Sequence, residues 1–223
     1  EVAHDRDAFV MVDNTFMSPL LQRPLEHGCD IVIHSATKFL GGHSDLIAGL
    51  AVTDDDRLAE RIKSRQTALG GILGPFDSWL LIRGMKTLQV RMERAQRTAR
   101  RLAGWLQDRP EVDRVMYPGL EDMPGHDVHR RQSDGPGAVL SFVTTEGTCA
   151  EKLTEETELW TLAVSLGGIE SIITLPSRMT HLPYPREELR ETGITDDLVR
   201  LSVGLEDPED LMSDLDRALR AAS

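Results

Sequence analysis

The stretch HSATKFLGGHSDLIAG, residues 34–49, is the most informative for the fold class, because it follows the apolar run of residues 30–33 and carries a lysine among small residues. Lys38 is one of four lysines among 223 residues, and the preceding run DIVI is typical of a buried parallel strand. Functional polar residues collect at the carboxyl ends of such strands. Desolvation there lowers the pKa of a lysine amine and makes it a nucleophile toward aldehydes. From the residues alone, an ordinary surface lysine is the alternative interpretation.

Three further polar residues fit a site around Lys38. Ser35 and Thr37 alternate with Ala36, so both hydroxyls can face one way, which suits a phosphate. Asp13 ends a second apolar run, FVMV, and can lie across the same pocket. A carboxylate that faces a pyridine nitrogen keeps that nitrogen protonated. Pyridoxal phosphate needs these parts: a Schiff-base lysine, phosphate donors and an acid at the ring nitrogen.

Strand and helix patterns alternate outward from this stretch. Apolar runs predict strands over residues 9–12, 31–33 and 46–54. The segment 53–70 is expected to be helical, with Thr53 or Asp54 as its N-cap and acidic residues in its first turn. This alternation predicts an α/β architecture.

A long helix is expected next, closed by Pro110. Seven apolar residues recur at steps of three and four and form one face: Met85, Leu88, Met92, Ala95, Ala99, Leu102 and Leu106. Four arginines fall largely off this face and are interpreted as a solvated surface with ion pairs: Arg91, Arg94, Arg97 and Arg101.

The second half of the chain mixes strands and helices in the way of a smaller α+β domain. Its closing helix is expected to begin with Asp207 as N-cap and Pro208 as its first residue. We set the domain boundary in the long helix, which gives a unit of residues 1–84 and a unit of residues 85–223. The opening residues, EVAHDRDA, read as the end of a helix, so we expect an N-terminal portion to precede Glu1.

Composition excludes several classes of function. The net charge of −12 argues against nucleic-acid binding, which needs a basic face. No run is long enough to span a membrane and no signal-peptide pattern opens the chain, so a soluble, cytoplasmic protein is expected. No metal is expected, because the spacings of His34, His43 and His181 fit no metal site. Cys29 and Cys149 follow no metal-type or redox-type spacing and are expected to be buried free thiols.

A family resemblance runs through the chain in order. The segments that carry it are VDNTFMSPLLQRPLEHGCDIVIHSATKFLGGHSDLIAG, LLIRGMKTLQVRMERA, VMYPGL, TLAVSLGGIESIITLPSRMTH and GITDDLVRLSVGLEDPEDLMSDLDRAL. The sequence resembles the C-terminal portion of the Cys/Met-metabolism family of pyridoxal-phosphate enzymes. The resemblance implies a fold-type I, aspartate-aminotransferase-like large domain that is incomplete at its N-terminus, followed by a smaller α+β domain. It also implies a homotetramer.

The family pattern carries over residue by residue to the cofactor. Lys38 matches the lysine that holds pyridoxal phosphate as a Schiff base and then acts as general base. Ser35 and Thr37 match the hydroxyls that bind the phosphate. Asp13 matches the acid that pairs with the ring nitrogen. The remaining cofactor contacts of the family come from an N-terminal portion, so this chain is expected to hold part of the site.

Three residues match the family's substrate site. Arg200 corresponds to the arginine that grips the α-carboxylate of an amino acid, and Ser165 lines that carboxylate site. Without the family, Arg200 is still a charge within an apolar strand, and it needs either a substrate carboxylate or a structural acid as its partner. Glu170 stands where synthase-like and cystathionine-lyase-like members often carry an acid that can meet the distal ammonium of cystathionine.

The resemblance implies γ-replacement or γ-elimination on sulfur amino acids, by a cystathionine γ-synthase or γ-lyase. Methionine γ-lyase and O-acylhomoserine sulfhydrylase are the alternatives within the family. Two hypotheses outside these activities stay open: an inactive fragment or assembly subunit, and a Schiff-base lysine enzyme that works without pyridoxal phosphate.

Overall fold

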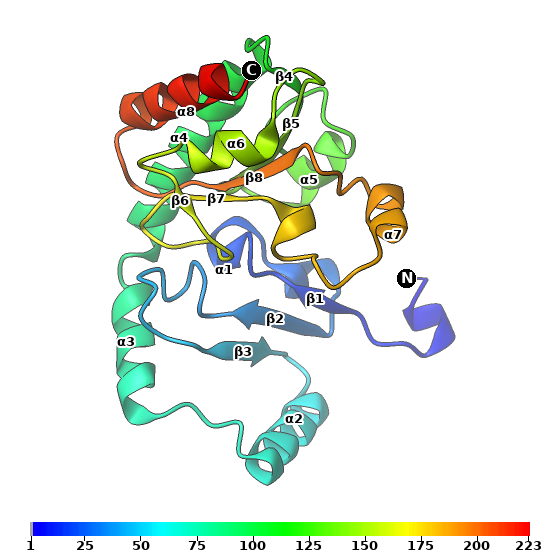
Figure 1. Ribbon diagram of the computed structural model, residues 1–223. Coiled ribbons are helices and arrows are strands. Elements are labelled where there is room, and N and C mark those ends of the chain that lie inside the picture. The colour runs from blue at the N-terminus through cyan, green and yellow to red at the C-terminus, as the bar shows by residue number, and fades with distance from the viewer. Residues whose placement is uncertain (1) are drawn as a thin grey trace.

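A computed structural model describes residues 2–223, and within that range its strands form two sheets (Figure 1). One sheet has three strands in the order β1-β2-β3, and the other has five in the order β4-β5-β8-β7-β6. The strands are β1 Met11–Asp13, β2 Ile31–Ser35, β3 Gly49–Val52, β4 Val112–Met116, β5 Val139–Thr144, β6 Thr161–Leu162, β7 Ile172–Thr174 and β8 Leu198–Ser202. The α-helices are α1 Ser18–Leu21, α2 Asp56–Leu69, α3 Pro75–Met85, α4 Leu88–Gln107, α5 His126–Gln132, α6 Ala150–Glu155, α7 Arg186–Glu191 and α8 Pro208–Ala222. The α/β class predicted from the sequence is confirmed.

The three-stranded sheet brings two predicted strand ends together. β1 runs parallel to β2, with Asp13 opposite Ile33, while β3 runs antiparallel to β2, with Gly49 opposite Ser35. Since β1 and β2 are parallel neighbours, their carboxyl ends lie at one edge of the sheet. Asp13 and Ser35 end these two strands.

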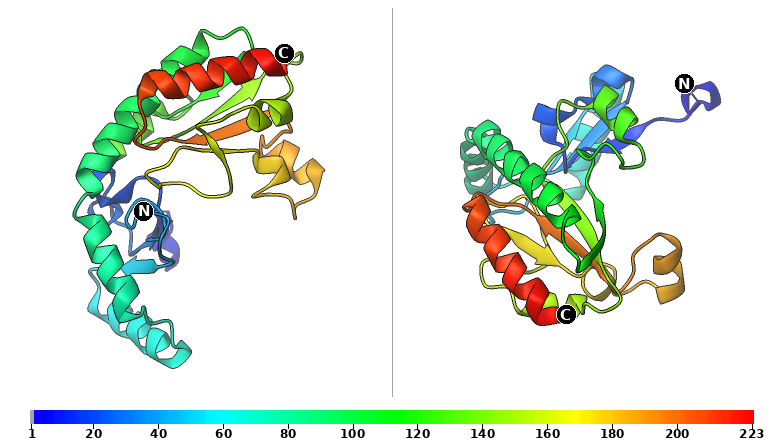
Figure 2. Two further views of the ribbon diagram at one scale, coloured as in Figure 1. Left: turned by 60° about the vertical axis from the view of Figure 1, so that its left-hand side comes forward. Right: turned by 90° about the horizontal axis from the view of Figure 1, so that it is seen from above.

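The five-stranded sheet packs against helices on one face. α4 and α8 lie side by side against it, as both views of Figure 2 show. Fully buried side chains from the helices and the sheet form this core, among them Leu106, Phe142, Val199 and Leu215. β8 lies in the middle of the sheet and carries Arg200, whose neighbours across the strands are Ser141 and Thr174.

A second core surrounds the segment after β2. It includes Phe39, Leu40 and Leu81, together with Leu88 and Met92 from the first turns of α4. α4 therefore contributes to both cores. The second core also includes Ala138 and Leu166, so it draws on both predicted units, and the division into residues 1–84 and 85–223 stays a prediction.

The expected long helix is interrupted. α3 ends at Met85 and α4 begins at Leu88, and Met85 is 38% exposed, so it does not belong to the buried face. The interruption lies at Thr87, whose hydroxyl donates to the Gly84 carbonyl at 3.1 Å. Such side-chain bonds give the backbone an alternative to continued helix. The six other predicted positions are confirmed as buried.

Arg91 corrects the interpretation of the arginine series as a solvated face. Its side chain is only 6% exposed and bonds to backbone carbonyls. Arg94 and Arg101 do form ion pairs, with Asp207 and Glu209. The solvated-face prediction is therefore wrong for Arg91, because the helix turns this position toward the segment that follows Lys38.

Helix caps follow the predictions in part. Asp207 caps α8 as expected, and its Oδ1 accepts the Glu209 N–H at 2.9 Å. α2 is capped by Asp55 rather than by Thr53 or Asp54. Asp55 Oδ1 accepts the Leu58 N–H at 2.8 Å, which satisfies one of the donors left free at the start of a helix. In the described range 2–223, no helix is both long and apolar enough to cross a membrane.

Candidate functional site

The segment after β2 folds back tightly and carries Lys38 at its turn. The Thr37 N–H donates to the Ala48 carbonyl at 3.2 Å, which fastens this segment to the start of β3. The Gly42 N–H then donates to the Lys38 carbonyl at 2.7 Å. Gly42 has a φ of +74°, in the left-handed region that favours glycine. Lys38 thus lies half-buried just beyond a buried strand, as the sequence predicted.

Lys38 contacts a residue from the second half of the chain. Its Nζ donates to Ser165 Oγ at 2.8 Å across 127 residues of sequence. Burial lowers the pKa of the Lys38 amine, and the positive charge of Arg200 lowers it further. A lowered pKa leaves more of the amine neutral near neutral pH, which a nucleophile or a general base requires.

Arg200 joins the same cluster through the backbone of Ser165. Its Nη2 donates to the Ser165 carbonyl at 2.9 Å and to Thr174 Oγ1 at 3.3 Å. Its Nε is buried without a hydrogen-bond partner in the described part of the chain, and no carboxylate there pairs with it. Burial lowers the pKa of the guanidinium. The structural acid considered as one partner of Arg200 is thus not found within residues 2–223, and a substrate carboxylate stays a prediction.

Asp13 and Ser35 are linked by a residue that the sequence reasoning missed. The Thr15 N–H donates to Asp13 Oδ1 at 2.9 Å, and Thr15 Oγ1 accepts the Ser35 N–H at 2.8 Å. An aspartate that accepts from the residue two positions on is a common turn, so the letters DNT could have identified Thr15. Asp13 is exposed at the same sheet edge as Ser35, and its hydrogen bond goes to Thr15 rather than to Lys38.

Thr37 and Ser165 line one cavity of about 730 Å³. Thr37 Oγ1 accepts the Ala48 N–H at 3.0 Å, so its hydroxyl is held in position. Glu170 stands exposed at the rim of this cavity, where its Oε2 accepts from Ser44 Oγ at 3.2 Å. The other lining residues are Ser44, Asp45, Leu46, Ile47, Asp77, Thr161, Ala163, Leu166 and Ile172. The cavity therefore draws its walls from both halves of the chain.

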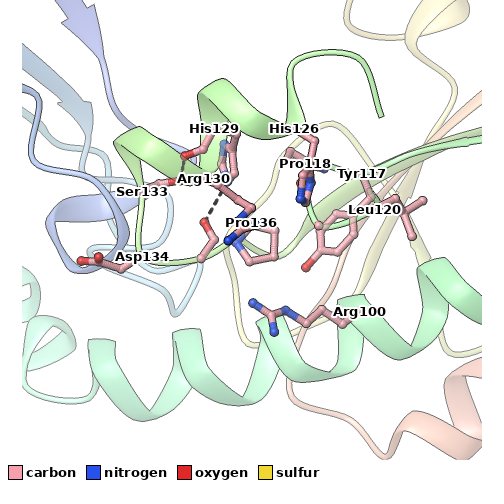
Figure 3. Close-up of a pocket in the computed structure, with 12 residues that line it drawn as sticks. Arg100, Tyr117, Pro118, Leu120, His126, His129, Arg130, Ser133, Asp134 and Pro136 are labelled. Atoms are coloured by element: carbon pink, nitrogen blue, oxygen red, sulfur yellow. Dashed lines mark hydrogen bonds between the residues drawn. The ribbon is translucent and has the colours of Figure 1, made fainter. Parts of the chain in front are cut away.

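A separate cavity of about 410 Å³ lies between α4 and the connector that carries α5. Figure 3 shows Arg100 projecting from α4 toward the wall that carries Tyr117. His126 Nδ1 lies 2.8 Å from the Pro118 carbonyl, and His129 Nε2 lies 3.0 Å from the Gly135 carbonyl. Both rings therefore bond to backbone within the connector that carries α5. No residue predicted for the site lines this cavity, whereas Thr37, Ser165 and Glu170 line the larger of the two, which is therefore the candidate site. Lys38 does not line that cavity itself and is connected to it through Ser165.

The histidines and cysteines considered as possible metal ligands make contacts of other kinds. His43 and His181 bond within their own turns, to the Gly41 carbonyl and to Thr180 Oγ1. His34 is buried, and burial lowers the pKa of its ring. In the part of the chain that the structure describes, no three His, Cys, Asp or Glu side chains are grouped as a metal site. Cys29 and Cys149 are free, but the prediction that both thiols are buried is wrong, because Cys149 is exposed at the start of α6 and Cys29 is half-buried.

The donor set beside Lys38 fits pyridoxal phosphate. It offers an amine with a lowered pKa, two hydroxyl residues at the end of one strand and a carboxylate at the end of the adjacent strand. The orphaned Nε of Arg200 adds an unused donor next to that amine, suited to a carboxylate. Lys38, Ser35, Thr37 and Asp13 could therefore hold the cofactor, and Arg200 an amino acid.

Known proteins match almost the full length of this chain. It is 50% identical to cystathionine beta-lyase MetC of Bacillus subtilis (strain 168), covering 99% of this chain and 56% of that protein. It is 47% identical to cystathionine gamma-lyase of the same organism, covering 98% of this chain and 58% of that protein. The chain thus spans little more than half the length of these relatives.

Solved structures and the family model agree with these matches. The crystal structure of cystathionine gamma-lyase from Lactobacillus plantarum complexed with L-serine superposes with a TM-score of 0.97 at 44% identity, covering 99% of this chain and 58% of that one. This likeness confirms the predicted fold type. The model of the Cys/Met metabolism PLP-dependent enzymes matches residues 1–220. The chain therefore belongs to the Cys/Met metabolism family of pyridoxal-phosphate-dependent enzymes.

Proposed function

We propose that the protein to which this chain belongs cleaves a carbon–sulfur bond of cystathionine, with pyridoxal phosphate bound through Lys38. One observation carries the proposal: Ser165 bonds to Lys38 through its hydroxyl at 2.8 Å and to Arg200 through its carbonyl at 2.9 Å. An amine that can act on Cα is thereby held beside a guanidinium suited to the carboxylate of the same substrate. The similar relatives include a beta-lyase and a gamma-lyase, so the proposal covers cleavage on either side of the sulfur.

Lys38 has two tasks in this proposal. Pyridoxal phosphate supplies an aldehyde for the substrate amine and a ring that stores the electron pair left at Cα. The Lys38 amine takes the proton from Cα, which its lowered pKa favours. It then delivers a proton toward the departing sulfur. The net reaction consumes cystathionine and water and releases a thiol amino acid, a 2-oxo acid and ammonia.

The other site residues bind the substrate and the cofactor and orient them toward Lys38. Arg200 grips the α-carboxylate with its planar fork, and Ser165 holds the Lys38 amine toward Cα. Ser35 and Thr37 donate to the cofactor phosphate, and Asp13 keeps the ring nitrogen protonated. The position of Glu170 on the cavity rim supports a role in binding the distal ammonium of cystathionine.

The test uses the full-length protein with pyridoxal phosphate and cystathionine. Release of pyruvate would identify a beta-lyase, and release of 2-oxobutanoate a gamma-lyase. The variant Lys38→Ala should lose at least about a thousandfold of this activity, because it lacks the general base. Full activity in Lys38→Ala, or no 2-oxo acid from the wild type, would overturn the proposal.

Assays of the same protein with other substrates, and after removal of the cofactor, separate the remaining candidate activities. A γ-synthase or an O-acylhomoserine sulfhydrylase would instead join a thiol to an O-acylhomoserine, and methionine γ-lyase would prefer methionine. A Schiff-base enzyme without pyridoxal phosphate would stay active after the cofactor is removed. An inactive assembly subunit would bind the cofactor and turn over none of these substrates.

We also infer a homotetramer. Large apolar side chains on α3 support burial against another chain, since Phe76, Trp79 and Ile82 are 69%, 53% and 54% exposed. Sedimentation of the complete protein tests this, and a monomer would contradict it. The cytoplasmic location stays a prediction from the sequence.

A further inference from the structure

Glu206 makes a two-point contact with Ser171. Glu206 lies in the turn between β8 and α8, and Ser171 directly precedes β7. The Ser171 N–H donates to Glu206 Oε1 and the Ser171 hydroxyl donates to Glu206 Oε2, both at 2.7 Å. Ser171 is fully buried, with 0% of its surface exposed. Both carboxylate oxygens of Glu206 are thus committed to one buried residue.

Backbone contacts extend this attachment on both sides. The Gly204 N–H donates to Ser171 Oγ at 2.8 Å, and the Leu205 N–H donates to the Ile169 carbonyl at 2.8 Å. The two segments are also in close approach, because a Cβ at Gly204 would lie 2.3 Å from the Ile169 carbonyl oxygen. We call this pair of segments, residues 169–171 and 204–206, the clasp.

Glu170 is the central residue of one half of the clasp. Its side chain lines the cavity that Ser165 and Thr37 also line. Neither Glu206 nor Ser171 lines the cavity, so Glu206 can act on it only through the backbone that joins Ser171 to Glu170. With Ser171 fixed on one side and Ile169 on the other, the backbone direction at Glu170 is set by the clasp.

We propose that Glu206 is a positioning residue that fixes where Glu170 meets the distal ammonium of the substrate. The inference rests on the proposed function, because it takes cystathionine as the substrate. A purely structural role is the competing explanation, since the Glu206 carbonyl also accepts from Arg94 Nη2 at 3.3 Å. The two explanations differ in one respect: a positioning role affects only substrates that carry the distal ammonium.

Kinetics of the full-length holoenzyme test this difference. Cystathionine is compared with an S-alkyl cysteine or homocysteine, which has the same α-amino acid end and no distal ammonium. We expect Glu206→Ala to raise KM for cystathionine about tenfold and to leave the S-alkyl substrate within about twofold. Glu170→Ala should give the same pattern, and the double variant should be no worse than either single one. Equal losses on both substrates would overturn the positioning role.

Two further variants serve as a conservative replacement and as a control. Glu206→Gln retains a carbonyl oxygen for the Ser171 N–H and should recover most of the loss, even if Glu206→Ala folds poorly. Glu209→Ala is the matched control, because Glu209 lies three positions on and pairs with Arg101 instead of the clasp. It should leave both substrates unchanged.

Hydrogen exchange supplies a readout that does not depend on activity. Glu206→Ala should speed amide exchange over residues 168–172 at least about tenfold, whereas Glu170→Ala should leave it unchanged. Unchanged exchange in Glu206→Ala would overturn the inference while leaving the proposed function intact. A wild type that does not turn over cystathionine would overturn the proposed function and the distal-ammonium role, and the exchange result would still decide whether Glu206 positions Glu170.

Discussion

The guanidinium of Arg91 occupies the space that a side chain at Gly42 would fill. A Cβ built at Gly42 would lie 2.0 Å from Nη1 of Arg91. Gly42 also closes the turn that carries Lys38, through its N–H to the Lys38 carbonyl. The absence of a side chain at Gly42 and the burial of Arg91 therefore depend on each other, and both bear on the position of Lys38.

Gly42→Ala should lower the free energy of unfolding by at least about 2 kcal/mol, because it combines a left-handed φ with a clash. Urea unfolding measures this. Gly70→Ala is the matched control, since Gly70 has a φ of +73° and open space around it. The control should cost about 1 kcal/mol, and equal losses at the two sites would show that the Arg91 contact contributes nothing.

Arg91→Met should destabilise the chain by roughly 3 kcal/mol. The guanidinium donates to the Phe39 carbonyl at 2.9 Å and to the Gly84 carbonyl at 3.0 Å. A methionine would remove both hydrogen bonds and leave the buried Phe39 oxygen without a donor, whereas the Gly84 oxygen would keep its bonds from Thr87. The stability of Arg91→Lys should lie between those of the wild type and Arg91→Met, because one ammonium group cannot replace the several donors of the planar guanidinium. Arg97→Met, on the exposed side of the same helix, should stay within about 0.5 kcal/mol. A stable Arg91→Met would contradict this account.

Arg200→Gln should raise the pKa of the Lys38 amine toward its ordinary value of 10.5, because the positive charge of Arg200 is the second cause of the lowered pKa, after burial. NMR titration of the isotopically methylated lysines measures this, with Arg217→Gln as control. An unchanged pKa would mean that burial alone sets it.

The same lowered pKa has a consequence for stability. The unfolded chain binds more protons at Lys38 than the folded chain between the lowered pKa and the ordinary value of 10.5. The contribution of Lys38 to stability therefore rises with pH across that window. Comparing wild type with Lys38→Met by urea unfolding at several pH values checks the sign, and a contribution that falls with rising pH would contradict it.

Thr174→Val should raise KM for an amino-acid substrate roughly fivefold with little change in kcat, because Thr174 Oγ1 accepts from Arg200 at 3.3 Å and helps to hold the guanidinium. Steady-state kinetics of the full-length enzyme measure the split. Thr67→Val, at an exposed position on α2 away from the cavity, serves as control. A fall in kcat at unchanged KM would argue against a role in holding Arg200.

The sequence predicted well what depends on neighbours along the chain. Apolar runs and their polar ends placed Lys38, Ser35 and Asp13 at strand ends, and the Asp207 cap follows from local chemistry. Contacts between residues far apart in the sequence could be predicted only from the family resemblance, because no residue near Ser165 in the sequence indicates that it contacts Lys38.

Two other features lay beyond pattern reasoning. A hydrophobic pattern counts every arginine as polar and therefore predicts a solvated Arg91, whereas in the folded chain its guanidinium is buried against backbone carbonyls. Thr174 stands in an apolar strand, and its purpose is visible only once β7 and β8 pair. In both cases the partner is backbone or a residue of another strand, which spacing along the sequence does not encode.

The contact between Lys38 and Ser165 also bears on the order of events during synthesis. Lys38 leaves the ribosome 127 residues before Ser165, and Arg200 follows later still. Until they arrive and the two sheets meet, the lysine is an ordinary hydrated ammonium that reacts poorly with the aldehydes of a cell. The lowered pKa of Lys38 is therefore established only after the later part of the chain has been made and has folded.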